Sequence, residues 1–246
     1  MSNTIKAVFS LLPSLVRLAR GAVVKGHRKE PAKPLELYDG EFCPYCRHVR
    51  EALTELDLDA IIHPVPRGGN RFRELLKEIG GKAKVPFLID ANTGKQLYDS
   101  EAIVSYLYEE YGPVGSRPPR RLIYLSLAAT LLRMKNGMFA RPSKAPAKIL
   151  ELYSFEASPY ARLVRETLCE LEIPYHLHNV GKGRGKPGEW LPPGARKNYV
   201  GTTENRRKLV ERGGQMMVPY LVDPNTGVAM YESAAIQAYL IKTYGG

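Results

Sequence analysis

Apolar and polar positions follow two spacings along the chain, and their order predicts an α/β fold. Short apolar runs typical of strands occupy 35–39, 60–65, 86–89 and 96–98. Segments in which apolar residues recur every three or four positions, typical of helices, are 44–56, 72–79 and 101–110. The order βαβαββα, with a parallel first half and a closing hairpin, predicts an α/β sandwich around a mixed sheet.

The second half of the chain repeats the first. Between 35–58 and 150–173, 14 of 24 positions are identical, and between 85–112 and 218–245, 15 of 28 agree. The offset grows from 115 to 133, so the second copy carries an insertion of 18 residues within about 181–212, a basic loop leading into a short helix. The same reading predicts strands at 150–154, 174–179, 219–222 and 228–231, and helices at 159–171, 203–212 and 234–243.

Turn and cap residues support these boundaries. Asn-Thr-Gly at 92–94 predicts a tight hairpin between two short strands. Pro44 suits the first turn of the helix 44–56. Ser100 is a good N-cap residue, so we expect it to cap the helix 101–110.

The domain organisation follows from the repeat. We expect a helical arm at 1–34, a first domain at 35–112, a linker with a second arm at 113–149, and a second domain at 150–246. The stretch 5–20 aligns with 120–135, and both are basic with the apolar spacing of an amphipathic helix. An interior copy cannot be a cleaved targeting segment, so we interpret both as structural helices that precede the domains. Weak association with a membrane surface is the alternative.

Charge and composition narrow the classes of function. The 246 residues include 36 basic and 25 acidic side chains, a net charge of +11, and the excess lies in the arms and the insertion around acidic domain cores. No apolar run approaches the roughly 18 residues that span a bilayer. No recognition motif indicates a nucleic-acid partner. Three cysteines exclude a disulfide scaffold and favour a reducing, cytoplasmic location.

The motif with the clearest chemistry is Cys43-Pro44-Tyr45-Cys46, where the first strand turns into the first helix. A helix N-terminus favours a thiolate, and a spacing of three residues puts both thiols on one helix face. Cys43 is therefore expected to attack a disulfide, and Cys46 to resolve the mixed disulfide. Arg47 and Arg50 are expected to add positive potential.

A metal site is the alternative interpretation of the two cysteines. The sequence contains no second Cys-x-x-Cys motif. The five histidines look scattered, without the spacing of zinc ligands. We therefore expect no metal. The third cysteine, Cys169, lies in the middle of a predicted helix and reads as a buried apolar-like residue.

Both copies resemble the thioredoxin-fold domain shared by glutaredoxins and the N-terminal half of glutathione S-transferases. The resemblance rests on the Cys43–Cys46 motif, on Val85-Pro86 before a strand, and on the run from Tyr98 to Ile103 into a helix. The implied fold is two tandem thioredoxin-like βαβαββα domains, each preceded by an amphipathic helix. The first copy also resembles the soluble domain of membrane-associated prostaglandin E synthase.

The resemblance implies how glutathione would bind as co-substrate. Pro86 is expected to be cis and to turn the Val85 backbone toward the cysteinyl part of glutathione. Ser100 and its helix N-terminus would take the γ-glutamyl carboxylate, and Asp99 would face the ammonium group. Lys84 would meet the glycyl carboxylate. Tyr45 belongs to the same expected contact set.

The second copy lacks the thiols, because its motif reads Ser158-Pro159-Tyr160-Ala161. A glutathione-shaped pocket is still expected there, formed by Val218, Pro219, Glu232 and Ser233, although Met217 replaces the lysine. Ser158 either favours a glutathione thiolate, as in serine-type glutathione transferases, or only caps its helix.

The function expected from the sequence is a glutathione-dependent thiol–disulfide oxidoreductase that acts on small-molecule or protein mixed disulfides. One alternative is a glutathione transferase or isomerase acting on a small electrophile, although the all-helical C-terminal domain that usually forms the electrophile pocket is absent. The other alternative is a non-enzymatic module that binds glutathione or a membrane surface. The basic arms would attract anionic glutathione if they lie beside the sites.

Overall fold

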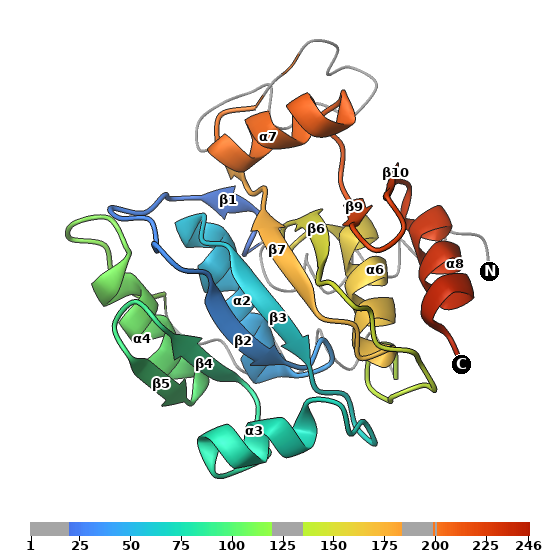
Figure 1. Ribbon diagram of the computed structural model, residues 1–246. Coiled ribbons are helices and arrows are strands. Elements are labelled where there is room, and N and C mark those ends of the chain that lie inside the picture. Colours follow the sequence, from blue (N-terminus) through green and yellow to red (C-terminus); the bar gives the residue numbers. More distant parts are fainter. Residues whose placement is uncertain (1–19, 120–134, 184–198, 200) are drawn as a thin grey trace.

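The computed structural model describes residues 20–119, 135–183, 199 and 201–246, and it contains the predicted elements in both copies (Figure 1). Most boundaries agree with the predictions to within one or two residues. The two expected arm helices fall almost entirely outside the described residues, as does the loop of the insertion at 184–198. The strands are β1 Val23–Val24, β2 Leu35–Asp39, β3 Ala60–Pro64, β4 Phe87–Asp90, β5 Lys95–Tyr98, β6 Leu150–Ser154, β7 Tyr175–Asn179, β8 Lys182–Gly183, β9 Tyr220–Asp223 and β10 Val228–Tyr231. The helices are α2 Pro44–Leu56, α3 Arg73–Gly80, α4 Ser100–Glu110, α6 Pro159–Glu170, α7 Glu204–Gly213 and α8 Ser233–Tyr244.

The two copies form one continuous sheet. Eight strands lie in the order β10-β9-β6-β7-β3-β2-β4-β5. Within each copy the first two strands are parallel and the last two form an antiparallel hairpin, as the sequence predicts. The copies meet where β3 pairs antiparallel with β7, with Ile61 opposite His176. This pairing removes one open edge from each half-sheet, so the repeat is an internal pseudo-dimer.

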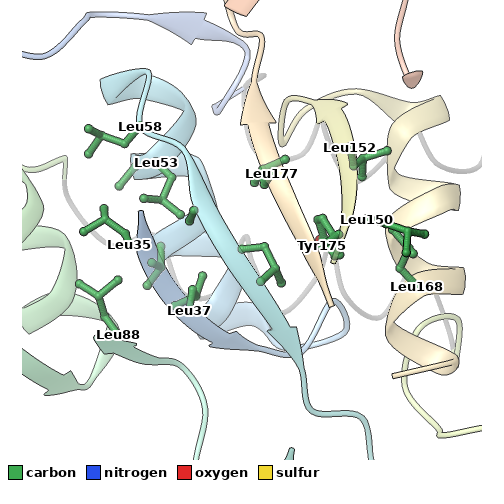
Figure 2. Packing of buried hydrophobic residues seen from close by; sticks show 14 of the residues in the cluster. Leu35, Leu37, Leu53, Leu58, Leu88, Leu150, Leu152, Leu168, Tyr175 and Leu177 are labelled. Carbon is green, nitrogen blue, oxygen red and sulfur yellow. The ribbon is translucent and has the colours of Figure 1, made fainter. Parts of the chain in front are cut away.

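Helices cover both faces of the sheet. The largest apolar cluster joins alternate strand residues of both copies to α2, α4, α6 and α8, and it continues across the β3–β7 junction (Figure 2). On the opposite face, Leu76 of α3 packs on Tyr38 and Phe87, while Leu209 of α7 packs near Tyr153 and Tyr220. The strands therefore alternate between a shared core and two smaller clusters, one for each copy.

The start of α4 differs from the expectation. The N-cap residue is Asp99, not Ser100, and Asp99 Oδ1 accepts hydrogen bonds from the backbone N–H groups of Glu101 and Ala102. Asp99 has a φ of 72°, a conformation that asparagine and aspartate tolerate better than most residues. Ser100 becomes the first helical residue and is buried. The carboxylate thus takes the capping position that we had expected the hydroxyl to take.

None of the helices in the described residues is long and apolar enough to cross a membrane.

Candidate functional site

Strand register brings the expected site residues of the first copy to one edge of the sheet. Tyr38, next to the end of β2, lies opposite Phe87, and Phe87 lies opposite Tyr98 at the end of β5. The residues one position further toward this edge are therefore neighbours. They are the turn after β2 that leads to Cys43, then Pro86 before β4, then Asp99 after β5, and together they form one row. Sheet pairing alone thus explains how three motifs, distant in sequence, reach a common place.

The Cys43 turn forms as its sequence predicts. Cys43 is the N-cap of α2 and Pro44 is its first residue. The Cys43 Sγ accepts a hydrogen bond from the backbone N–H of Cys46 at 3.5 Å, and the Cys46 Sγ accepts one from Gly40 N–H at 3.5 Å. Cys43 is 8% exposed and Cys46 is fully buried, and both are free thiols. Cys43 is therefore the outer thiol of the pair.

The surroundings shift the pKa values of the two thiols in opposite directions. A hydrogen bond from the Cys46 side chain is the main cause that lowers the pKa of Cys43, and backbone N–H groups at the helix start add to it. Burial is the main cause that raises the pKa of Cys46 well above its usual value. The structure therefore favours a thiolate at Cys43 and keeps Cys46 protonated as its hydrogen-bond donor.

Arg47 and Arg50, which were expected to add positive potential, are not among the main causes of the lowered pKa of Cys43, although Arg50 acts on Cys46. Arg50 is fully buried, and it donates to Asp39 at 2.7 Å and to Glu156 of the second copy at 2.9 Å. Arg47 lies 3.5 Å from the same Glu156 carboxylate. Their charges are thus engaged by carboxylates, and the lowered pKa of Cys43 comes from Cys46 and the backbone.

These arginines belong to a buried charge cluster between the copies. Each copy contributes an arginine that binds a glutamate of the other copy. Arg165 of α6 binds Glu41 of the first copy at 3.1 Å, and Arg50 of α2 binds Glu156 of the second. Burial alone would raise the pKa of Glu156, but Arg165 and Arg50 hold it well below its usual range. Glu41 precedes Cys43 by two residues. A side chain of the second copy therefore binds the turn that leads to Cys43.

No local pattern in the sequence indicates this cluster. Its four arginines occupy equivalent positions of α2 and α6, where a charged side chain is typical of a helix surface. Only the long-range pairing of β3 with β7 turns those helix faces toward each other. The cluster consists of Asp39, Glu41, Arg47, Arg50, Glu156, Arg162 and Arg165.

The remaining expected contacts of the first copy are in place for an extended ligand. The Val85–Pro86 bond is cis, as expected. Pro86 is buried, Val85 is partly exposed and Lys84 is exposed. Tyr45 is 43% exposed, so its ring is accessible from solvent beside the Cys43 turn. The row therefore offers backbone, aromatic and cationic groups to a molecule lying along it.

Ser100 carries the most specific signal in this row. Its hydroxyl is buried at the N-terminus of α4 and makes no hydrogen bond within the described part of the chain. Buried hydroxyls are almost always paired, so an unsatisfied one at a helix N-terminus points to a partner that is not protein. Asp99, the adjacent cap, supplies a negative charge at the same place.

The second copy keeps the same row without the thiols. Ser158 is buried and caps α6, with its Oγ accepting from Ala161 N–H at 3.3 Å. The Val218–Pro219 bond is cis, and Glu232, with a φ of 71°, precedes the buried Ser233. Glu232 makes no side-chain cap bond to α8, in contrast to Asp99. The two rows are thus alike in backbone and unlike in chemistry.

Comparison with known families gives the same result for both copies. The family model described as "Glutathione S-transferase, N-terminal domain" matches residues 37–117 and again 152–246. The chain belongs to this family. The glutathione S-transferase N-terminal domain thus occurs twice, and the family implies glutathione as the ligand class.

Other comparisons add little detail to the family assignment. Among solved structures, the chain is similar to "Leishmania TDR1 - a unique trimeric glutathione transferase", at 14% identity and a TM-score of 0.32, covering 87% of this chain and 68% of that one. No curated protein sequence matches this member of the glutathione S-transferase family.

Proposed function

We propose that the protein is a glutathione-dependent thiol–disulfide oxidoreductase, with Cys43 as its nucleophile. The observation that carries the proposal is the difference between the two thiols. Cys43 is the outer thiol, at a helix N-terminus, and its pKa is lowered by a hydrogen bond from Cys46, the inner buried thiol, whose pKa is raised. Attack on a disulfide needs a thiolate, and this arrangement favours its formation at Cys43.

Glutathione would bind along the row that begins at the Cys43 turn. Its γ-glutamyl carboxylate would accept from the buried Ser100 hydroxyl at the N-terminus of α4, and its ammonium group would face Asp99. Its backbone would pair with Val85 as an added strand. Lys84 would meet the glycyl carboxylate. This pose leaves the glutathione sulfur at the Cys43 end of the row.

The reaction consists of two thiol–disulfide exchanges. The Cys43 thiolate attacks the glutathione sulfur of a mixed disulfide, the S–S bond breaks, and the released thiolate takes a proton. A second glutathione thiolate then attacks the glutathione sulfur bound to Cys43, which forms glutathione disulfide and returns the Cys43 thiolate. Alternatively, Cys46 displaces glutathione and forms a Cys43–Cys46 disulfide, which two further glutathione molecules reduce. The raised pKa of Cys46 favours the first route.

The second copy would bind glutathione without exchanging disulfides. It keeps Val218, Pro219 and Ser233 in the same register, but Ser158 and Ala161 replace the two thiols. Ser158 already accepts the Ala161 N–H, which supports its role as a cap. We therefore assign turnover to the first copy alone.

Turnover of a glutathionylated peptide, coupled to reduction of the glutathione disulfide formed, tests the proposal. Cys43→Ser is expected to abolish turnover, and Cys46→Ser is expected to retain most of it. Cys169→Ser is the matched control, because it makes the same replacement at a buried thiol near the end of α6 and keeps an acceptor for the backbone N–H of Glu41. Full activity in Cys43→Ser would refute the assignment.

A conjugation assay with a generic electrophile on the same preparation separates the transferase alternative. The oxidoreductase proposal expects mixed-disulfide turnover that depends on Cys43. Conjugation that persists in Cys43→Ser, with no mixed-disulfide turnover in the native chain, would favour a transferase instead.

A further inference from the structure

A second cluster of reactive side chains lies where the copies join, on the face of the sheet opposite α2 and α6. His176 and His178 are two residues apart on β7, so both point to that face, and Asp59 immediately precedes the neighbouring strand β3. Figure 1 shows the start of β3 beside the end of β7, with α7 beyond it. These two histidines, which look scattered in the sequence, therefore lie beside each other and beside Asp59 in the structure.

One carboxylate oxygen faces both imidazoles. Asp59 Oδ2 lies 2.9 Å from His178 Nδ1 and 4.0 Å from His176 Nε2, and the three ligand atoms all lie within 4.8 Å of one another. Ligand atoms around a tetrahedral zinc ion are roughly 3.3 Å apart, because metal–ligand bonds measure about 2.0–2.1 Å. Small side-chain rotations would therefore bring the three atoms to coordinating distance.

Outer partners hold two of these groups in the orientation that a ligand needs. Asp59 Oδ1 accepts from the Asn179 backbone N–H at 2.9 Å and from Asn205 Nδ2 at 2.7 Å, which leaves Oδ2 directed at the histidines. His178 Nε2 lies 3.0 Å from Glu151, and Arg212 binds that carboxylate in turn. A carboxylate on the far nitrogen of a histidine is the usual second shell of a metal ligand.

Comparison of the two copies shows which of these side chains occur in both and which occur on one side of the junction only. His63, at the position equivalent to His178, also pairs with a glutamate, Glu36, at 2.8 Å, and both histidines stack on a tyrosine. A His–Glu pair is thus part of the architecture of both copies. The positions equivalent to His176 and Asp59 are Ile61 and Pro174, so only one side of the junction carries two further ligands.

The surroundings favour a cation. The three groups line a pocket of about 260 Å³ that also contains Glu30, Asp57 and Glu204. Lys208 lies in the same pocket, but it pairs with Glu204 at 2.6 Å. His176 and Asp59 are 30% and 28% exposed, which gives an ion a path from solvent. A chain of net charge +11 thus has an acidic pocket at its centre.

We propose that Asp59, His176 and His178 bind a divalent first-row transition metal ion such as Zn²⁺ at the junction of the two copies. Two imidazole nitrogens and one carboxylate oxygen are ligands for this class of ion, whereas Mg²⁺ and Ca²⁺ prefer oxygen ligands alone. Three protein ligands leave a coordination position for water or a small ligand. Binding replaces the His178–Asp59 hydrogen bond with two bonds to the ion.

Competition for Zn²⁺ against a chromophoric chelator tests the proposal on the full-length, tag-free chain. Cys43→Ser/Cys46→Ser serves as the background, because the two thiols are the competing zinc ligands. One Zn²⁺ per chain is expected. His176→Asn and Asp59→Asn should each weaken binding at least tenfold, and Glu151→Gln should weaken it about 10–100-fold through the second shell. Mg²⁺ and Ca²⁺ should not compete.

The matched control is His63→Asn, which removes the equivalent His–Glu pair in the first copy and should leave Zn²⁺ affinity unchanged. Circular dichroism verifies that each variant is folded. Substitution with Co²⁺ gives an independent measurement, since its visible spectrum should indicate nitrogen and oxygen ligands and disappear in His176→Asn. No Zn²⁺ bound in the background chain, or equal affinity in folded His176→Asn and Asp59→Asn, overturns the proposal. Mixed-disulfide turnover is measured separately, so either proposal can fail alone.

Discussion

At the scale of the residue, the reactivity of Cys43 depends on the side chain three positions later. The Cys46 thiol is the main cause of the lowered pKa of Cys43, while burial keeps Cys46 itself protonated. The arginines of the same helix are engaged elsewhere, in pairs with Asp39 and Glu156. The pKa of Cys43 is therefore set mainly by a neutral donor, which a substitution can remove or replace.

Removing that donor should raise the pKa of Cys43. In Cys46→Ala, the pH at which Cys43 becomes half reactive toward iodoacetamide should move upward, so alkylation at neutral pH should slow. In Cys46→Ser a hydroxyl donor remains, and the shift should be smaller. Rates of alkylation measured across the titration of Cys43, in a Cys169→Ser background that keeps an acceptor for the Glu41 backbone N–H, give these values. An unchanged pH profile in Cys46→Ala would show that the backbone N–H groups alone set the pKa of Cys43.

At the scale of the element, α4 and α8 begin in the same backbone conformation but are capped differently. Asp99 and Glu232 both have a φ near 70°, yet only Asp99 accepts the first N–H groups of its helix. The longer glutamate makes no such bond. The two helix starts therefore form a natural pair in which one feature, the cap, is varied.

Asp99→Ala should lower the free energy of unfolding by about 1–2 kcal/mol, because it removes a side-chain cap. Asp99→Asn keeps an acceptor and tolerates the positive φ, so its change should stay within about 0.5 kcal/mol. Urea denaturation followed by circular dichroism measures both. Glu232→Ala, which loses no cap bond, is the matched control, and a loss there equal to that of Asp99→Ala would contradict the capping argument.

The sequence was sufficient for the elements and insufficient for some of their details. Periodicity and turn residues predicted α2 from Pro44 to Leu56 at the observed bounds, because local spacing decides which residues a helix buries. The start of α4 was placed one residue late, since both Asp99 and Ser100 are good caps and only the backbone conformation chooses between them. His176 and His178 had a local signal, the i, i+2 spacing on a strand, but their third partner lies more than a hundred residues away.

At the scale of the whole molecule, the copies exchange charged side chains across the junction. Arg50 reaches Glu156 and Arg165 reaches Glu41, and all four are almost completely buried. Buried charges are costly when one partner is lost. The turn before Cys43 therefore has its position fixed by a residue of the other copy.

Glu156→Ala should lower the free energy of unfolding by about 3–5 kcal/mol, because it leaves buried arginines without their shared carboxylate. Glu110→Ala is the control, since its 2.6 Å pair with Lys29 is exposed and should contribute at most about 1 kcal/mol. Thermal and urea unfolding measure the two variants together. Equal losses would mean that the buried cluster contributes no more than a surface pair.

The junction itself could not be predicted from local patterns. In sequence, each copy has its own strands, hairpin and helices. No pattern within either copy indicates which strand pairs with its edge strand. The β3–β7 pairing is a contact between residues such as Ile61 and His176, and the four arginines of the charge cluster are buried beside it. Long-range pairing of this kind depends on the whole surface of both halves.

Covalent fusion of the two halves has an evolutionary consequence. In a dimer of identical subunits, every substitution appears twice, so the position of Asp39 and the equivalent position of Ser154 would always hold the same residue. In one chain, each side of the pseudo-twofold axis mutates independently. A thiol can be kept in one half and discarded in the other, and a ligand set can assemble on one side of the seam only. Gene duplication followed by fusion gives this molecule the freedom of a heterodimer without the risk of mispairing.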